Sequence, residues 1–402
     1  MPIVENKQGT RSRRYDFDWL RVLAVLLLIY FHAAAVFYRG ELGEFYIQNA
    51  QPSQLMNALI LFIHQWHMPL FFLISGAGTW FALLHRSSQQ YVQERGQRLF
   101  IPFVFGTLFL VPPQVYLRLL NQSATDRAYW QFYPQFFNGV RPYGNFEWAH
   151  LWFLIYLFTF SILALPLLIV LRDAPLRSTL ANWIEKPGVI LLMALPLALI
   201  EGSLRPHWFG FQNLYDDWAN VCLYLLYFIY GYLICSDARF GSAIDKHLGI
   251  ATTLAIVCMS VLLSLWQTDL IPDRAYSVNY VLYQCFRGCN SWFWVLMLLG
   301  LGRKFLNVNS RLLSYTNEAA YPVYLLHQTV LVSIAFYVVR WNAAVMTKFW
   351  TISTATVVVT IALYELFIRR FNLVRFLFGL KPVIRQSRQE ASIATASDSS
   401  QS

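Results

Sequence analysis

The sequence predicts an all-α polytopic membrane protein, a bundle of about ten transmembrane helices with N- and C-termini cytoplasmic. Three observations support this fold class. Of the 402 residues, 57% are hydrophobic and only 13% are charged, against about 25% charged residues in soluble domains. Apolar runs of about 20 residues, long enough for a helix to cross a bilayer, recur along the chain. Basic residues lie mainly between alternate runs, as in membrane proteins.

Each apolar run is interpreted as a helix, because a helix satisfies its own backbone hydrogen bonds inside hydrocarbon. The second run is longer than a bilayer requires and the fifth is short. Pro196 within the fifth run predicts a bent helix that extends toward Pro206. The candidate spans cover residues 19–38, 55–85, 99–119, 149–171, 188–200, 217–235, 249–267, 279–302, 317–339 and 349–368.

The distribution of basic residues predicts the orientation. Most of the 31 Lys and Arg residues lie on the side that holds both termini, which is therefore the cytoplasmic side. Arg287 lies inside the eighth span. The eight basic residues of the other side are Arg39, Arg118, Arg127, Arg141, Arg205, Arg274, Arg340 and Lys348. This asymmetry favours a membrane reading of the net charge of +10 over a nucleic-acid partner.

Three parts of the chain are expected. Residues 1–18 form a cytoplasmic N-terminal segment, and residues 19–385 form the ten-helix membrane domain. Residues 386–402 are rich in Ser, Ala and Gln without apolar periodicity, which predicts a disordered cytoplasmic tail. The sequence does not fix the oligomeric state.

Ionisable side chains within the predicted spans are the first candidates for function, because burying them in hydrocarbon is costly. The set comprises His32, His64, His67, Arg287 and His327. At 1.5 Å per residue, His32 lies roughly 20 Å from the cytoplasmic end of its span. The same measure places the others in the middle or outer half of the membrane, where all five are expected to converge on one cavity.

A structural reading of these residues stays open. A histidine in a span often makes one hydrogen bond between helices. Arg287 would neutralise a carboxylate, with Glu318 and Glu365 as candidate partners, or would bond to backbone carbonyls. His64 and His67 share a helical face, but this spacing alone does not specify a metal site, and no metal is predicted.

A second cluster lies at the cytoplasmic ends of the first and third spans. Asp18 and Arg21 lead into the first span, and Arg95 and Arg98 into the third, with Glu94 beside them. Guanidinium groups suit phosphate oxygens, so these residues are candidates for holding a phosphorylated cytosolic substrate. Arg13 and Arg14 fit ordinary positive-inside anchoring better.

The predicted outer side carries an aromatic segment between residues 129 and 148. Interfacial aromatic belts explain many such residues, and the alternative is a platform for sugar rings that includes Trp148 and Trp152. Glu147 and His150 follow at a spacing of one helical turn, which predicts a general acid/base or hydroxyl-orienting pair.

Five motifs in order along the chain resemble the membrane acyltransferase 3 family. They are Asp18–Arg21 followed by His32, Met68–Gly76, Arg95–Pro102, His150–Leu154 and Tyr321–His327. The chain is most similar to the branch that succinylates periplasmic glucans, through Phe62–His64, Leu363–Glu365 and Phe376–Val383. One departure stands out: many members carry an R-x-R pattern at the third helix, whereas here Arg95 and Arg98 are three apart.

The resemblance implies an integral membrane O-acyltransferase of the bacterial inner (plasma) membrane. It would move an acetyl or succinyl group from cytosolic acyl-CoA, a co-substrate rather than a permanent cofactor, to a hydroxyl of a periplasmic or cell-envelope glycan. His32 is then the first choice for base or acyl carrier, with His327 or His67 orienting it. Arg21, Arg95 and Arg98 would grip the CoA, and Arg287 would pair with a succinyl carboxylate.

Two other classes stay open at this point. A transporter or flippase for a glycan or a lipid-linked sugar would use the same polar cavity without chemistry. A sensor or scaffold would use the histidines as pH-responsive pairs. Consumption of an acyl thioester would distinguish an enzyme from a transporter or flippase and from a sensor or scaffold.

Overall fold

The computed structural model describes residues 14–40 and 45–383, and within these ranges the chain is helical with no β-strand. Seven helices are long and apolar enough to cross a membrane, or up to nine if each of two bent pairs is one span. The chain is therefore an all-α multi-pass membrane protein, as predicted. The count of ten spans and the cytoplasmic termini stay predictions. Arg13 and the tail 386–402 lie outside the described residues.

The predicted spans correspond to helices whose ends differ by several residues. The seven are α1 (Tyr15–Ala35), α2 with α3 (Gln54–His64, His67–His85), the continuous helix α4 to α6 (Ser88–Asn121), α13 (Trp218–Ser236), α14 (Ala238–Gln267), α16 (Arg311–Val338) and α17 with a π-helical turn η5 (Val345–Leu363, Tyr364–Ile368). The bent pairs are α8 with α9 (Trp152–Leu163, Leu165–Arg172), at 54°, and α10 with α11 and α12 (Ala174–Ile184, Val189–Leu192, Ala194–Leu204), at 105°. Shorter elements are α7 (Tyr129–Phe132), η3 (Tyr133–Phe137), η4 (Ala149–Leu151) and α18 (Asn372–Leu377).

One predicted span is not among these seven helices and two bent pairs, because it is less apolar. Helix α15 (Val278–Phe305) has 28 residues but includes Gln284, Arg287 and Asn290, which lower its hydropathy. Gln284 and Asn290 are buried. The helix therefore turns polar side chains toward the interior of the bundle, where it packs on α12 and α14.

The continuous helix from α4 to α6 contains two π-helical turns, η1 (Gly96–Phe100) and η2 (Gly106–Leu110). Pro102 follows the first turn and has no N–H to donate to the carbonyl of Arg98. The hydroxyl of Tyr321, from α16, donates to that carbonyl at 2.6 Å. This bond ties the first half of α16 to the helix that carries the predicted basic margin.

Helices α3 and α13 cross in backbone contact at two glycines. A Cβ on Gly76 would lie 1.8 Å from the carbonyl oxygen of Phe228, and one on Gly231 would lie 1.8 Å from that of Leu73. Close packing of small residues is a main source of helix association in membranes. The glycine that ends the Met68–Gly76 motif is thus required by helix packing rather than by chemistry.

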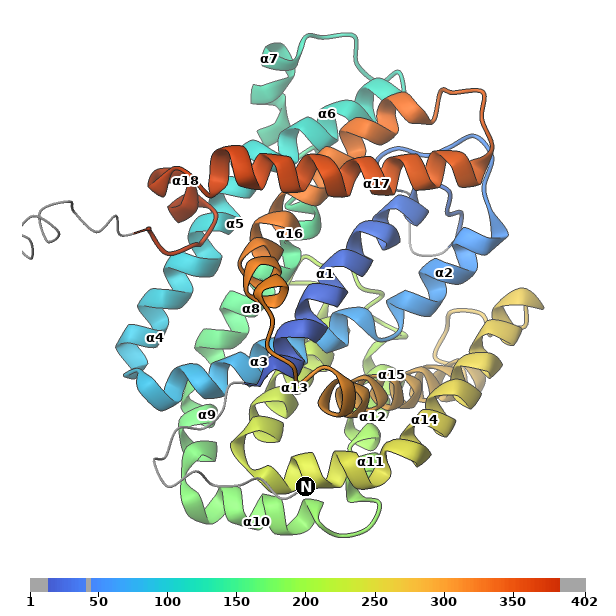
Figure 1. The fold of residues 1–402 in the computed structure, drawn as a ribbon. Coiled ribbons are helices and arrows are strands. Elements are labelled where there is room, and N and C mark those ends of the chain that lie inside the picture. Colours follow the sequence, from blue (N-terminus) through green and yellow to red (C-terminus); the bar gives the residue numbers. More distant parts are fainter. Residues whose placement is uncertain (1–13, 41–44, 384–402) are drawn as a thin grey trace, which may run out of the picture.

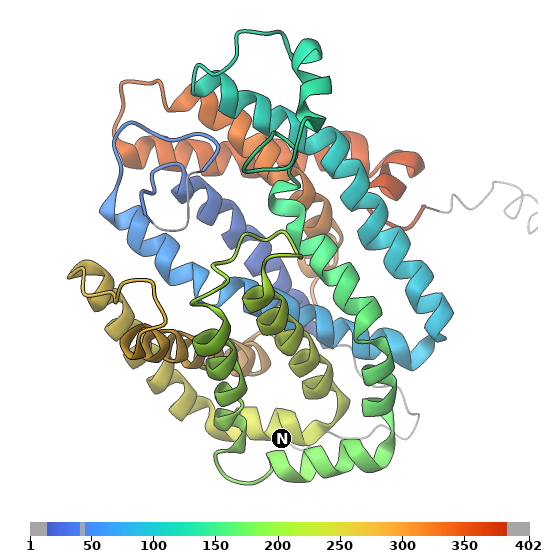
Figure 2. The same cartoon turned by 180° about the vertical axis from the view of Figure 1, so that it is seen from behind.

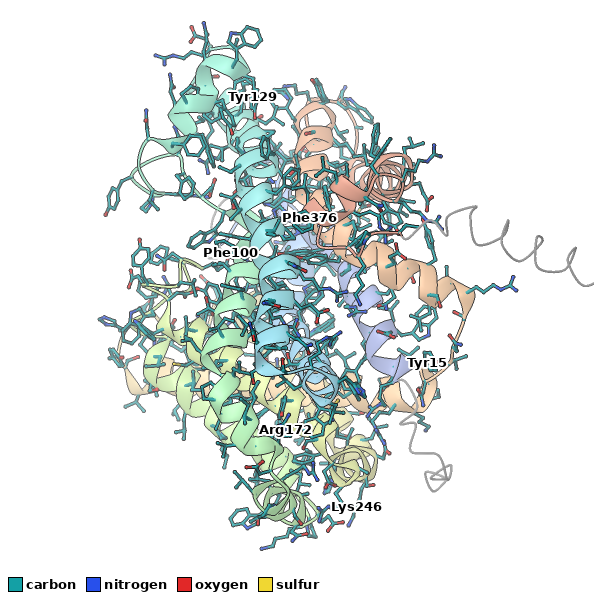
Figure 3. All side chains as sticks on the ribbon, turned by 90° about the vertical axis from the view of Figure 1, so that its left-hand side faces the viewer. Tyr15, Phe100, Tyr129, Arg172, Lys246 and Phe376 are labelled. Atoms are coloured by element: carbon teal, nitrogen blue, oxygen red, sulfur yellow. The ribbon has the colours of Figure 1, made fainter. Side chains whose placement is uncertain are left out.

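The bundle places α1 and α16 side by side at its centre (Figure 1). Helix α17 packs on the outside of both, and α8 to α13 form the opposite face in green to yellow-green (Figure 2). Tyr129 lies at one end of the molecule, and Arg172 and Lys246 lie at the other (Figure 3). The predicted topology also places the loop of Tyr129 opposite those of Arg172 and Lys246, whereas Phe376 of the C-terminal segment lies between the two ends (Figure 3).

Candidate functional site

The centre of the candidate site is a pair of imidazoles contributed by the two central helices. Nδ1 of His32, on α1, lies 3.0 Å from Nε2 of His327, on α16. His327 is fully buried and His32 is half-buried. Packing of α1 on α16 therefore joins two of the five predicted intramembrane residues.

The hydrogen-bond partners assign the tautomers of this pair when both rings are neutral. Nδ1 of His327 lies 2.5 Å from the carbonyl oxygen of Tyr324, which only accepts, so this nitrogen carries the hydrogen. Nε2 of His327 then accepts from Nδ1 of His32, whose N–H also faces the carbonyl of Leu28 at 3.1 Å. The lone pair of His32 is left on Nε2, the nitrogen that can take a proton or attack an acyl carbon.

His150 is the third imidazole of the site. Its ring centroid lies 5.1 Å from that of His327. Nε2 lies 3.0 Å from the carbonyl of Leu325, and the hydroxyl of Tyr324 donates to the His150 carbonyl at 2.7 Å. Nδ1 of His150 is buried and has no hydrogen-bond partner within the described residues. Since Nε2 faces a carbonyl and carries the hydrogen, Nδ1 keeps a lone pair that no described protein group uses.

The predicted pairing of His150 with Glu147 is wrong. The chain is not yet helical at Glu147, because Ala149 has a positive φ of 47° and the helical turn η4 begins there. Glu147 accepts instead from Arg118 at 2.9 Å and from Arg141 at 2.7 Å. The spacing of one turn therefore does not place the two side chains on one face.

His67 lies near the pair without contacting it. Its Nε2 is 2.8 Å from the carbonyl oxygen of Ala24 on α1. Phe31 separates the two histidines, since its ring contacts both His32 and His67 at centroid distances of 5.3 and 6.3 Å. His67 thus ties α3 to α1 behind the imidazole pair.

Arg287, on α15, and His64, at the end of α2, lie at the break between α2 and α3, and their described hydrogen bonds do not include the pair. Arg287 donates to the side-chain oxygens of Gln65, at 3.2 Å, and Gln284, at 3.1 Å. The expected neutralisation by Glu318 or Glu365 is wrong, because these carboxylates pair with Arg375 and Arg369. Within the described residues no carboxylate forms an ion pair with Arg287, and His64 is half-buried beside Gln65.

A line of polar side chains on α16 connects the basic margin to the imidazoles. Asn317 accepts from Arg21, Tyr321 bonds to the Arg98 carbonyl, and Tyr324 bonds to His150. The rings of Tyr321 and Tyr324 are stacked, with centroids 6.3 Å apart. Sequence reasoning included both tyrosines in the Tyr321–His327 motif but gave them no role, although the steps of three residues from Tyr321 to Tyr324 and from Tyr324 to His327 place all three on one helical face.

The other margin residues are engaged with one another. Arg21 pairs with Asp18 at 3.1 Å, and Arg98 with Glu94 at 3.3 Å. Arg95 donates to Thr79 at 3.2 Å, and its guanidinium lies 4.8 Å from the ring centroid of Tyr91. Arg14 pairs with Asp16.

The two tryptophans predicted to bind substrate pack within the protein. Nε1 of Trp148 donates to the carbonyl of Gln212 at 2.8 Å. Trp152 is buried against Tyr156 and Tyr224. Neither ring is presented to the imidazole pair by the contacts that hold it.

Sequence reasoning also missed a buried ionic cluster near the outer end of α12. Arg205 bonds to both carboxylate oxygens of Glu201, at 2.5 and 3.0 Å, and to Asn220 at 2.9 Å. Asp217 accepts from Asn220 and from the hydroxyl of Tyr156. Burial raises the pKa of the Asp217 carboxyl above its ordinary value, although these donors oppose the shift. The visible signal was Glu201 and Arg205 four residues apart on an apolar helix.

Fold and site together define a multi-pass membrane protein with an imidazole pair inside its helical bundle. A family model described as an acyltransferase domain (acyltransferase 3) matches residues 14–365. The chain therefore belongs to this family and is an acyltransferase. No group of three His, Cys, Asp or Glu side chains in the described part of the chain is arranged to hold a metal ion.

Curated relatives support the same assignment. The chain is 24% identical to glucans biosynthesis protein C of Escherichia coli O139:H28 (strain E24377A / ETEC), over 94% of this chain and 98% of the relative. It is also 24% identical to the proteins of that name from Escherichia coli O157:H7 (strain EC4115 / EHEC) and O6:K15:H31 (strain 536 / UPEC), with the same coverage. No solved structure matches the chain.

Proposed function

We propose that this acyltransferase is an inner-membrane enzyme that transfers an acetyl or succinyl group from cytosolic acyl-CoA to a hydroxyl of a periplasmic or cell-envelope glycan. Counting α15 and both bent pairs as spans gives the even number of spans that two cytoplasmic termini require. The observation that carries the proposal is the lone pair on Nε2 of His32, set by the hydrogen bond to His327.

The proposed chemistry follows from that lone pair. Nε2 of His32 takes the proton of the acceptor hydroxyl while the oxygen attacks the thioester carbonyl carbon. The C–S bond breaks, and the CoA thiolate receives the proton from the imidazolium. The N–H at Nδ1 of His32 donates a hydrogen bond to Nε2 of His327. This bond stabilises the imidazolium and holds the ring in place. In the other route Nε2 attacks the thioester carbon and the C–S bond breaks, so that CoA leaves as its thiolate. The acceptor hydroxyl then attacks the acyl-imidazole, the C–N bond breaks, and the hydroxyl proton passes to the thiolate.

The donor would enter from the basic margin. Arg21, Arg95 and Arg98 would bind the CoA phosphates, and the acyl end would lie along the stacked tyrosines of α16 toward His32. The contacts of Arg21 and of the Arg98 carbonyl with α16 support this proposal. Within this proposal Arg287 pairs with the free carboxylate of a succinyl group, because its described partners are neutral amides. An anionic ligand would offset the cost of its half-buried charge.

The test uses the purified protein in proteoliposomes. Acetyl-CoA or succinyl-CoA labelled in the acyl group is supplied on the cytoplasmic face, and label is measured on extracted envelope glycans for the wild type and His32→Ala. The exposed His207, replaced by alanine, is the matched control. Absence of labelled glycan with every donor refutes the proposal. Glycan movement without thioester consumption supports a transporter or flippase instead.

A further inference from the structure

The loop between α1 and α2 places an aromatic ring directly on the proposed reactive histidine. The ring of Phe45 stacks on the imidazole of His32, with centroids 5.8 Å apart and planes at 29°. Phe45 also contacts Tyr46 edge-on, at 5.6 Å. The segment Phe45–Asn49 is called the outer cover below, because it follows the end of α1 that is predicted to face outward.

The first anchor of the outer cover is Tyr46. Its side chain is buried, and the guanidinium of Arg118, which pairs with Glu147, lies 5.5 Å from its ring centroid. Glu147 is itself held by Arg118 and Arg141. Burial, together with the charge of Glu147, keeps the pKa of Tyr46 well above its ordinary value, so the hydroxyl retains its proton.

The second anchor is Asn49, which is 2% exposed. Its side-chain oxygen accepts from Nζ of Lys348 at 2.9 Å, and its backbone carbonyl accepts from Arg39 at 3.0 Å. Lys348 is buried in α17 and also donates to the Val339 carbonyl at 2.9 Å. A buried ammonium group is expensive; one of its two hydrogen bonds within the described residues holds the outer cover, and the other holds the end of α16.

The stacking of Phe45 on His32, with anchors on the same segment, has a chemical consequence for an acyl transfer that uses His32 as base. Water offered to Nε2 would lose a proton there, its oxygen would attack the thioester carbon, and the C–S bond would break. The products would be the free acid and CoA, with the thiolate taking the proton back. Excluding water from the site prevents this side reaction.

We propose that Phe45 is a specificity-determining residue that keeps water from His32, so that the acyl group goes to a sugar hydroxyl rather than to water. This inference rests on the proposed function. The apolar ring repels water, whereas the apolar face of a sugar ring can pack against it and bring a hydroxyl to His32. The signature is therefore the partition of thioester between hydrolysis and transfer.

The experiment measures CoA release with and without glycan acceptor in proteoliposomes that contain the wild type or Phe45→Ala. Phe45→Ala is expected to raise acceptor-independent hydrolysis about tenfold relative to transfer. Phe45→Leu, which keeps apolar bulk, is expected to stay within about twofold of the wild type. The matched control is Phe211→Ala, which removes an exposed phenylalanine from another loop.

A second variant tests the same inference without altering Phe45. Lys348→Met removes the ammonium that holds Asn49 and is expected to raise hydrolysis in the same direction, by a smaller factor. An unchanged partition in every folded variant, or an equal loss of hydrolysis and transfer in Phe45→Ala, overturns the inference. If Phe45→Ala does not fold, the Lys348→Met partition decides. A wild type that transfers no acyl group refutes the proposed function instead, which is a separate outcome.

Discussion

The bundle contains two buried polar clusters, the Glu201–Arg205–Asp217 cluster beside α12 and the His32–His327 pair between α1 and α16. In the first, Arg205 meets both oxygens of Glu201 and the amide oxygen of Asn220, and Asp217 accepts from further donors. In the second, no described protein group hydrogen-bonds to Nε2 of His32.

The difference between the two clusters distinguishes polar groups that stabilise the fold from polar groups that can react with a substrate. Groups whose hydrogen bonds are all made inside the protein are expensive to break and have nothing left to offer a substrate. In the second cluster, Nε2 of His32 keeps a lone pair. The neighbouring His150 keeps another on its buried Nδ1, which has no partner in the described chain. Burial alone marks both clusters, and only the unused hydrogen-bonding capacity marks the one suited to chemistry.

The sharpest test of this comparison is His32→Ala, which should lower acyl transfer by about 10²–10⁴-fold, the usual worth of a general acid–base group. The melting temperature should change little, because His32 is half-buried and its hydrogen bonds are few. Labelled glycan and thermal unfolding in detergent are both measured, with His207→Ala as control. Full activity in His32→Ala would remove the pair from the mechanism.

Arg205→Leu should produce the opposite pattern. It leaves Glu201 buried without its partner and should cost about 3–5 kcal/mol in the free energy of unfolding. Activity should fall only as far as the folded fraction falls. The double variant Glu201→Leu with Arg205→Leu should recover part of this loss, since an apolar pair replaces the ionic one. Exposed Arg127, changed to leucine, is the control. A change in transfer rate at full stability would place Arg205 in the site.

Sequence reasoning located the costly residues and not their partners. His32 and His327 were identified because an imidazole in an apolar run is exceptional. The helical rise of 1.5 Å per residue predicted their depth in the membrane. Which helix lies opposite each residue depends on packing, which periodicity does not encode. Arg287 therefore forms hydrogen bonds with Gln65 and Gln284 rather than an ion pair with a glutamate. The positive φ of Ala149 also removes the helical spacing expected between Glu147 and His150.

His327 gives a smaller effect that tests the tautomer. His327→Leu removes the acceptor for Nδ1 of His32 and should lower transfer by about 100-fold, since the ring can then turn or change tautomer. His327→Gln offers an amide oxygen at a similar distance and should recover about tenfold of that loss. Transfer rates of both variants are compared at equal folded protein. Equal losses in the two would show that His327 supports packing rather than the orientation of His32.

Arg287 gives the smallest effect and the one that depends on the donor. Its guanidinium bonds to two neutral amides, so a carboxylate on the acyl group would be its natural ion partner. Arg287→Leu should lower succinyl transfer about tenfold more than acetyl transfer, because only succinyl carries a second carboxylate. Arg287→Lys keeps the charge and should lose less. The ratio of the two transfer rates is measured within each variant, so differences in folded fraction cancel. Equal losses with both donors would mean that Arg287 braces the α2–α3 break through Gln65 and has no part in donor selection.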